Sequence, residues 1–306
     1  MRAGVVIPVG PDPAELERLD DAVDALRAHV PDLDVLVLLD DAPRPRGLGR
    51  MVDWDDTRLV ELPTPRVRRS PHPNDRMSAG TLTFLAWLAE GSPPDYLVKL
   101  DTDALVIGDF RPSIEAAIER RPQVAVWGAY RENELGGRPR DFSMYALPMK
   151  LARMPVRPRR PFTIEPALTG ARGRARRFVS ATLRAAREHG YELGEHCLGG
   201  SYAVTRAGAV RMRERGYLDD PLATYGTRLG EDMVVGLLAR AAGLELGSLV
   251  APGEAFAVRF RGLLADPDEL VTRGHAIVHS VKDHGGASER RLRAEFRAAR
   301  APAAKV

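Results

Sequence analysis

The sequence of 306 residues has little cysteine, little lysine and no long apolar run, and each shortage excludes a class of protein. Its single cysteine, Cys197, excludes an internal disulfide and a metal site built from several cysteines. No run of about eighteen apolar residues occurs, so we expect no membrane-spanning helix. Because Met1 leads almost at once into the apolar residues 5–7, we also expect no signal peptide, and we predict a cytoplasmic protein.

The net charge of the chain is small, although the chain has many basic residues. Lys and Arg together number 45 and leave a net charge of +3, and a hydrophobic fraction of 44% is enough for a large buried core. A nucleic-acid-binding protein usually carries a concentrated basic face and a recognisable module. Only residues 153–177 approach such a face, so nucleic acid is not an expected partner.

The first forty residues alternate between strand and helix patterns. Residues 4–9 are a continuous apolar run of the kind that is buried in a parallel sheet. Residues 13–29 follow with apolar side chains at helical spacing, and residues 34–39 are predicted to form a second buried strand. This order predicts a right-handed crossover with a nucleotide-sized crevice at the carboxyl ends of the strands. The same alternation continues to residue 127, so we predict an α/β fold.

The residues at the ends of these two strands are candidates for binding a nucleotide. Pro8, Val9 and Gly10 end the first strand, and Asp40 and Asp41 end the second. At the mouth of a crevice they are placed to contact a base and a ribose. A solvated turn after the second strand explains the two aspartates equally well.

A third predicted strand, residues 96–100, ends on Asp101 and Asp103, which are one residue apart. If the chain stays extended, both carboxylates point the same way. Two such carboxylates repel each other unless a cation lies between them, and hard oxygen ligands suit Mn²⁺ or Mg²⁺. Because these ions are usually bound together with substrate phosphates, we expect a phosphate-bearing substrate. Solvated carboxylates in a turn are the alternative.

Two predicted helices begin with side chains suited to binding or catalysis. Arg76 starts residues 74–90, where a helix N-terminus already favours an anion such as a diphosphate. Glu231 and Asp232 lie in the first turn of residues 230–243, where the helix dipole keeps a carboxylate ionised and available as a base. The simpler explanation of Arg76 is an ordinary surface arginine. The simpler explanation of Glu231 and Asp232 is that acids at a helix start only stabilise the helix.

The middle of the chain departs from the alternating pattern. Residues 131–197 hold six prolines and many arginines, and we predict an irregular basic insertion over the crevice, near the acceptor side. Within it residues 175–189 form a candidate basic helix. Three roles are compatible with this helix: binding of an acidic acceptor, peripheral contact with a membrane surface, and a face that is only solvated. We expect a single domain over residues 1–286, followed by a basic helix and tail over residues 287–306.

Four short motifs occur in a characteristic order. They are Lys99-Leu-Asp-Thr-Asp103, Gly199-Gly-Ser-Tyr-Ala-Val-Thr205, Gly230-Glu-Asp-Met-Val-Val-Gly236 and His279-Ser-Val-Lys282. Over residues 5–282 this order resembles that of the metal-dependent GT-A glycosyltransferases, and within them the inverting β-1,3-galactosyltransferase and fringe-like group. The resemblance implies the GT-A (Rossmann-like) fold, in which helices flank a mixed, mainly parallel sheet.

The resemblance also implies roles for single residues. Asp101, Asp103 and His279 are expected to bind Mn²⁺ (or Mg²⁺), Asp232 to act as general base, and Glu231 to lie beside it. The residues that we add to the donor side are Lys99, Asp101, Thr102 and Lys282, and those on the acceptor side are Gly199, Gly200 and Tyr202. The acidic motif is shorter than the run often seen in galactosyltransferases, and the anchor and disulfides of eukaryotic members are absent. The sugar and the linkage therefore stay open.

We predict an inverting glycosyltransferase that moves a sugar from a nucleotide-diphosphate donor, with a UDP-sugar favoured, to an acceptor hydroxyl. A catalytically inactive relative that binds a nucleotide sugar or a glycan is one alternative. A sugar-phosphate nucleotidyltransferase is another, although it would usually begin with a glycine-rich basic phosphate loop, which residues 9–13 do not provide. The acceptor and the oligomeric state are not determined by the sequence.

Overall fold

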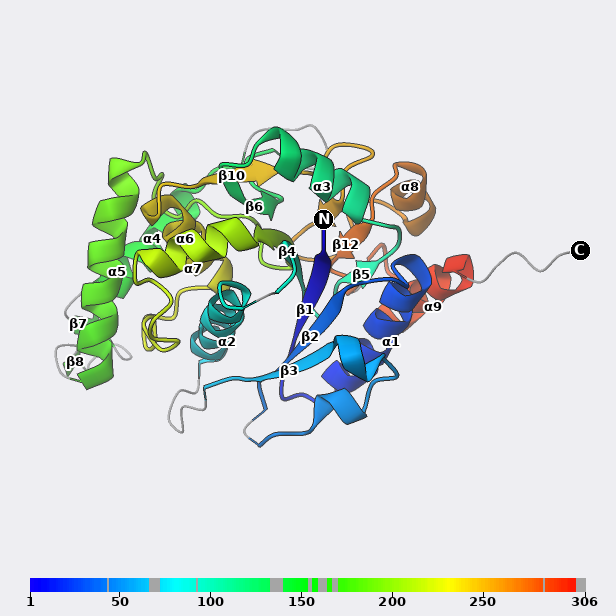
Figure 1. Ribbon diagram of the computed structural model, residues 1–306, viewed down its shortest axis with the longest axis horizontal. Helices are drawn as coiled ribbons and strands as arrows, with labels where there is room; N and C mark the ends of the chain where they lie inside the picture. Colours follow the sequence, from blue (N-terminus) through cyan, green and yellow to red (C-terminus); the bar gives the residue numbers. More distant parts are fainter. Residues whose placement is uncertain are drawn as a thin grey trace, which may run out of the picture.

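A seven-stranded sheet with the order β10-β6-β9-β4-β1-β2-β3 forms the centre of the protein (Figure 1). The computed structural model describes residues 1–42, 44–65, 72–91, 93–132, 140–153, 156–158, 164–166, 170–282 and 284–300. β9 runs antiparallel to both of its neighbours, whereas the other neighbouring strands are parallel. The strands are β1 Ala3–Val9, β2 Val35–Asp40, β3 Leu59–Pro63, β4 Tyr96–Leu100, β6 Val124–Gly128, β9 Ser201–Thr205 and β10 Glu245–Ser248.

Helices cover both faces of this sheet. The α-helices of the described residues, some of which pack on other helices, are α1 Ala14–His29, α2 Pro73–Leu88, α3 Arg111–Arg120, α4 Ser143–Arg153, α5 Gly170–Glu188, α6 Arg206–Glu214, α7 Glu231–Ala241, α8 Pro267–Thr272 and α9 Glu289–Arg300. Val5 and Ile7 of β1 enter one core cluster, and Val6 between them enters the other. Because both faces are buried, the strands read as continuous apolar runs. The predicted class, a mainly parallel α/β sheet between helices, is confirmed.

A smaller sheet joins the end of the chain to the acidic motif. It has the order β11-β12-β5, with strands Phe256–Val258, Ile277–His279 and Leu105–Val106. β12 pairs with β5 in antiparallel register, and just beyond these strands the Val281 N–H donates to the Asp103 carbonyl (2.8 Å). His279 is thereby held next to the motif.

The segment 131–197, predicted to be irregular, contains two helices, α4 and α5. The predicted basic helix 175–189 falls largely within α5, because Ala175, Val179, Leu183 and Ala186 recur at helical spacing and are buried. α5 packs against α7 and α4 (Figure 1). A two-stranded hairpin, β7 Val156–Pro158 and β8 Ile164–Pro166, lies between the two helices in sequence. Residues 133–139, 154–155, 159–163 and 167–169 lie outside the described part of the chain.

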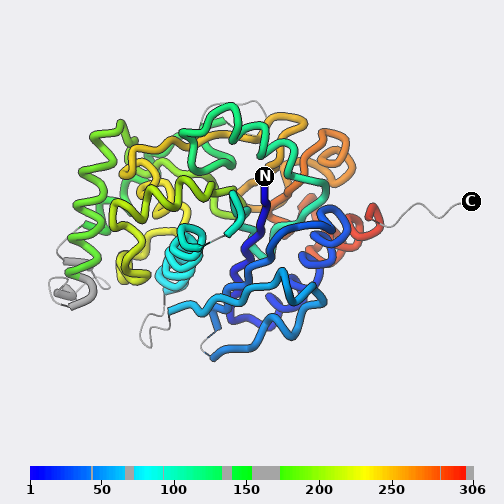
Figure 2. The backbone as a smooth tube through the Cα atoms, viewed as in Figure 1, coloured from blue at the N-terminus to red at the C-terminus, as the bar shows by residue number. Residues whose placement is uncertain are grey.

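The C-terminal helix α9 lies against the first helix, α1, as the red and blue tubes in Figure 2 show. Leu292 and Phe296 of α9 share one core cluster with Leu19 and Leu26 of α1. The predicted tail, residues 301–306, lies outside the described residues. Among the helices that are described, none combines the length and the apolar character that a bilayer span requires.

Candidate functional site

Several chain segments meet at one edge of the main sheet. β1, β2 and β4 are parallel, so their carboxyl ends lie at the same edge. β9 runs in the opposite direction, and therefore Gly199 and Gly200, which precede it, lie at this edge too. The Asp101 N–H donates to the Gly200 carbonyl across it (3.1 Å). A cavity of about 930 Å³ opens here, within the size range of small-molecule binding sites.

Most of the site residues predicted from the sequence line this cavity. They are Pro8, Gly10, Asp41, Arg76, Asp101, Thr102, Asp103, Gly199, Gly200, Glu231, Asp232, His279 and Lys282. They come from the ends of β1, β2, β4 and β12 and from the starts of β9, α2 and α7. The fold thus brings together residues that lie as far apart in sequence as Pro8 and Lys282.

Four predicted residues are placed elsewhere. Val9 lies in the core and Tyr202 is buried beneath the cavity, each at most 1% exposed. The Asp40 carboxylate accepts bonds from the Ala42 N–H (3.0 Å) and the Arg46 N–H (2.6 Å) and so holds the loop after β2. Burial by itself would raise the pKa of Asp40, but these donors hold it below its usual value. Lys99, the fourth, supports the site from below.

Asp101, Asp103 and His279 form a group that suits a divalent cation. One ligand atom from each lies within 4.8 Å of the other two. The His279 Nδ1 is 2.7 Å from the Arg259 carbonyl, and because a carbonyl only accepts, Nδ1 carries the proton and the Nε2 lone pair is left for a ligand. Two carboxylates and one imidazole are ligands that Mn²⁺ and Mg²⁺ accept. The residues present therefore fit such an ion.

The two aspartates converge through a turn and not through an extended strand. β4 ends at Leu100, and the Ala104 N–H donates to the Asp101 carbonyl (2.9 Å), which closes the turn. The expectation that strand alternation aligns the two side chains is therefore corrected. Their convergence depends on the contacts that hold this turn.

The two carboxylates have different electrostatic surroundings. The Lys282 Nζ is 2.7 Å from Asp103 Oδ2, and the His279 Nε2 is 3.4 Å from Asp103 Oδ1. Burial by itself would raise the pKa of Asp103, but in the absence of a metal ion His279, when both of its ring nitrogens are protonated, and Lys282 hold it far below its usual value. Burial raises the pKa of Asp101 to about 6, although Lys99 opposes this rise. Asp103 is consequently the more firmly ionised member of the pair.

Lys99 joins the acidic motif to helix α7. Its side chain is 1% exposed, and its Nζ lies 2.6 Å from Asp101 Oδ1 and 3.1 Å from Glu231 Oε1. It also donates to the Gly199 carbonyl. Burial lowers the pKa of Lys99, but Asp101 and Glu231 raise it by more, to well above its usual value. The ammonium therefore offsets two neighbouring carboxylates that would otherwise repel each other.

Asp232 is the carboxylate best placed to act as a base. It lies in the first turn of α7, its side chain is 20% exposed, and its Oδ1 accepts from the Met233 N–H (2.7 Å). Burial raises the pKa of Asp232, which makes it a stronger base.

His196 faces Asp232 from the buried side. The His196 Nε2 is 3.5 Å from Asp232 Oδ2, and its Nδ1 is 2.7 Å from the Gly194 carbonyl, so Nδ1 carries the proton. The Arg140 guanidinium donates to Nε2 (3.0 Å). Burial lowers the pKa of His196 to about 4, and the imidazole is neutral near pH 7. Asp232 therefore has no ion pair with His196 that would weaken it as a base.

Sequence reasoning missed several residues of the cavity. They include Glu15, Tyr145, Arg259, Phe260, Arg261 and Ser280. Glu15 lies in the first turn of α1, just after β1. The only signal for it is this position, which every α/β fold of this kind has, so it does not single out Glu15. Arg259 to Arg261 follow β11 in a loop that has no motif. Phe260 is 77% exposed at the rim, with the Arg261 guanidinium 5.8 Å from its ring centre.

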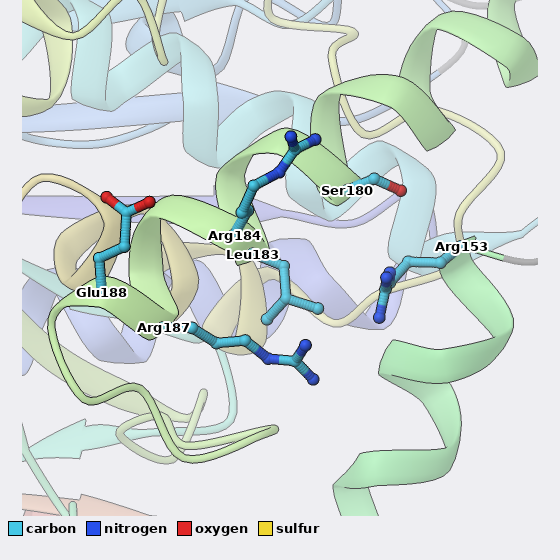
Figure 3. Close-up of a pocket in the computed structure, with 6 residues that line it drawn as sticks. All are labelled: Arg153, Ser180, Leu183, Arg184, Arg187 and Glu188. Atoms are coloured by element: carbon cyan, nitrogen blue, oxygen red, sulfur yellow. The ribbon is translucent and has the colours of Figure 1, made fainter.

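A second hollow, of about 540 Å³, lies between α4 and α5 (Figure 3). It is lined by Arg153, Ser180, Leu183, Arg184, Arg187 and Glu188, and it shares no residue with the site cavity. In Figure 3 Arg153 extends from the end of α4 beside the α5 side chains. Arg153, Arg184 and Arg187 are thus gathered away from the acidic motif. Of the described residues in 131–197, Tyr145 lines the site cavity.

Gly200 is required at its position because His279 packs directly on it. A Cβ at Gly200 would lie 2.2 Å from the His279 ring. We expect Gly200→Ala to displace His279 and to weaken Mn²⁺ binding at least about tenfold, as the loss of groups that orient metal ligands does. Titration of Mn²⁺ into the metal-free protein measures this. Gly108→Ala, whose Cβ would find its nearest atom at 3.5 Å, is the matched control and should bind as the wild type.

No protein-family model matches the sequence, and no curated protein does. Among solved structures the fold is similar to galactosyltransferase LgtC in complex with donor and acceptor sugar analogues, with a TM-score of 0.46, 11% identity and coverage of 99% of this chain and 98% of that one. It is also similar to mannosyltransferase PcManGT from Pyrobaculum calidifontis in complex with GDP-Man and Mn²⁺ (TM-score 0.39, 14% identity, 81% and 54% covered). A third is S. aureus TarS (TM-score 0.39, 11% identity, 82% and 58% covered). With TM-scores below one half, these likenesses assign neither a family nor an activity to this chain.

Proposed function

We propose that the protein is a GT-A glycosyltransferase that transfers a sugar from a nucleotide-diphosphate donor, a UDP-sugar by preference, to an acceptor hydroxyl with inversion. One observation carries the proposal. A single cavity holds a group suited to a divalent cation, Asp101, Asp103 and His279, together with a partly exposed carboxylate, Asp232, at a helix start. An ion-binding group and a base in one cavity are what transfer from a nucleotide diphosphate requires.

The donor is proposed to lie along the carboxyl ends of β1 and β2. Pro8 and Gly10 offer backbone at the end of β1, and Asp41 offers a carboxylate at the end of β2. The Arg76 guanidinium donates to Asp41 Oδ2 (3.1 Å) and so orients that carboxylate. Burial raises the pKa of Asp41, and Arg76 opposes the rise. Arg76 at the start of α2 and Lys282 beside Asp103 are the proposed cationic contacts for the diphosphate.

Asp101, Asp103 and His279 would hold Mn²⁺ or Mg²⁺. When bound there, the ion supplies Lewis-acid stabilisation of the negative charge on the departing nucleotide diphosphate. The protein's own share is to fix the three ligands. Lys99 holds Asp101 from below, the Arg259 carbonyl sets the tautomer of His279, and the Ser280 hydroxyl donates to Asp103 Oδ2 (3.1 Å).

Asp232 is proposed to take the proton of the acceptor hydroxyl as that oxygen attacks the anomeric carbon. Attack on the face opposite the leaving group inverts the anomeric configuration. The Met233 N–H orients the carboxylate, and His196 behind it is neutral and so does not neutralise it. Glu231, paired with Lys99, is held beside it. Retention of all these groups argues against a binding-only relative.

Calorimetric titration of UDP and GDP tests the donor part of the proposal. We expect UDP to bind in the presence of Mn²⁺ and not in the presence of a chelator, because the diphosphate is held through the ion. GDP is expected to bind more weakly. If neither nucleotide binds with Mn²⁺ present, the glycosyltransferase proposal fails.

A further inference from the structure

We propose that Arg293 of the C-terminal helix is a positioning residue for the Asp101-Thr102-Asp103 turn, so that α9 is part of the metal site. The inference rests on the proposed function, because it concerns how the proposed ligands are held. Arg293 is separated from Thr102 by 191 residues of sequence, yet its guanidinium donates to the Thr102 carbonyl (2.8 Å). It touches neither the cavity nor any proposed ligand directly.

A closed circuit of side chains connects both polar groups of Thr102. The Thr102 hydroxyl donates to Glu15, and the Arg18 guanidinium donates to Glu15 Oε1 (2.8 Å) and to Glu289 Oε2 (2.7 Å). The Arg293 Nε donates to Glu289 Oε1 (3.0 Å), and its second nitrogen returns to the Thr102 carbonyl. These five residues, Thr102, Glu15, Arg18, Glu289 and Arg293, are called the Thr102 ring. The ring holds the middle residue of the motif through its side chain and its backbone together.

The position of Arg293 is that of an interior residue and not of a surface cation. Its exposure is 7%, and its remaining nitrogen donates to Asp21 Oδ2 of α1 (2.8 Å), which is 3% exposed. The guanidinium thus meets three acceptors from three elements: Glu289 on α9, Asp21 on α1 and the Thr102 carbonyl. A planar fork with five N–H donors can serve three directions at once, whereas an ammonium on a flexible stem cannot hold the same geometry.

The ring completes the support of the turn. The Asp101 N–H donates to the Gly200 carbonyl, and the Asp103 carbonyl accepts from the Val281 N–H, so the first and third motif residues are held by backbone. Thr102 lies between them and depends on the ring. Because the two carboxylates converge only through this turn, a shift of Thr102 moves them relative to each other.

The expected effect is on metal affinity. Loss of groups that orient metal ligands typically costs 10- to 100-fold in affinity. Arg293→Met keeps a long side chain and removes all three donors, and we expect it to weaken Mn²⁺ binding by that factor. Arg297→Met is the matched control: Arg297 also donates to Asp21 (3.1 Å), but it is 60% exposed, and within the described part of the chain it makes no hydrogen bond to a member of the ring. It should bind Mn²⁺ within twofold of the wild type.

The experiment titrates Mn²⁺ into the nucleotide-free, metal-stripped proteins and measures free Mn²⁺ by its electron-spin resonance signal. Unfolding temperatures in chelator are recorded for each protein, because a merely structural role would lower them without changing the affinity of the folded protein. Arg293→Lys keeps the charge and loses the fork, and it is expected to stay weakened. Affinity of Arg293→Met equal to that of the wild type would overturn the inference.

Thr102→Val provides a second test that leaves the α1–α9 contacts of Arg293 in place. It removes the hydroxyl that donates to Glu15 and opens the ring at one bond. We expect several-fold weaker Mn²⁺ binding, and wild-type affinity would overturn the role of the ring. A wild-type protein that binds no Mn²⁺ would overturn the proposed function itself. A wild type that binds Mn²⁺, with both variants binding equally well, overturns the inference alone.

Discussion

Asp232→Asn is expected to lower kcat by about 10² to 10⁴, the range that a positioned general base usually contributes. The amide keeps the size of the carboxylate and its place at the start of α7, but it cannot accept the proton of the acceptor hydroxyl. Metal-dependent nucleotide binding should stay within about twofold of the wild type, because Asp232 holds neither the ion nor the base of the donor in the proposed arrangement. Steady-state transfer kinetics and nucleotide calorimetry on the same preparations measure both quantities.

The pH dependence of kcat provides a further check on Asp232. A base must be ionised, so the rate of the wild type should rise with pH through the pKa of Asp232, which burial raises above its usual value. The rate of Asp232→Asn should lack this acid limb. His196→Gln is the matched comparison: it removes the imidazole 3.5 Å from Asp232 but leaves the base, so the limb should persist. An unchanged kcat in Asp232→Asn would rule out its role as base.

Asp103→Ala is expected to abolish Mn²⁺-dependent nucleotide binding, a loss of at least about 100-fold. Asp103 is one of the three proposed ligands, and it also accepts bonds from Ser280 and Lys282. Removing it leaves the Lys282 ammonium without its nearest carboxylate. Calorimetric titration of UDP with Mn²⁺ present measures the effect.

The control for this variant is an aspartate far from the cavity. Asp53 is 97% exposed and pairs only with Arg27 among the described residues, so Asp53→Ala should bind UDP as the wild type does. The two site variants should also differ in their affinity for the donor nucleotide: Asp103→Ala no longer binds it, and Asp232→Asn binds it as the wild type does. Equal loss of donor affinity in both would contradict the proposed division between ligand and base.

The strand ends were predictable because strands that are buried on both faces consist almost entirely of apolar residues. Residues 4–9 and 35–39 are apolar without interruption, and Lys99 is the one charged residue in 96–100. The polar residues that follow these strands have to lie at the sheet edge. This placed Gly10, Asp41 and Asp101 correctly at one cavity without any structural information. The Glu231–Asp232 helix start was predictable in the same way, from a glycine and two acids before an apolar stretch.

Contacts between distant segments were not predictable. Lys99 was expected to contact the donor, but its alternation in β4 buries it beneath Asp101 and Glu231. His196 and Arg293 reach the site through packing of α4, α7 and α9, which no local spacing encodes. The turn at Asp101 likewise depends on a bond to Ala104 that competes with strand continuation. Local patterns define the edge of the sheet, and long-range packing defines the geometry at that edge.

The reversed strand β9 has a consequence for how such a protein can be re-engineered. β6 and β9 are hydrogen-bonded neighbours, with Gly128 opposite Tyr202, and the Leu198 N–H donates to the Ala129 carbonyl (3.0 Å). Residues 129–200 therefore connect two adjacent strands, which lie about 4.8 Å apart. A foreign segment grafted between these strands has to match that single gap and to supply an apolar cover for α7 in place of α5. The exchange has to keep Gly199 and Gly200, because the Asp101 N–H donates to the Gly200 carbonyl and His279 packs on Gly200. Pro8, Gly10 and Asp41, at the ends of β1 and β2, would be untouched.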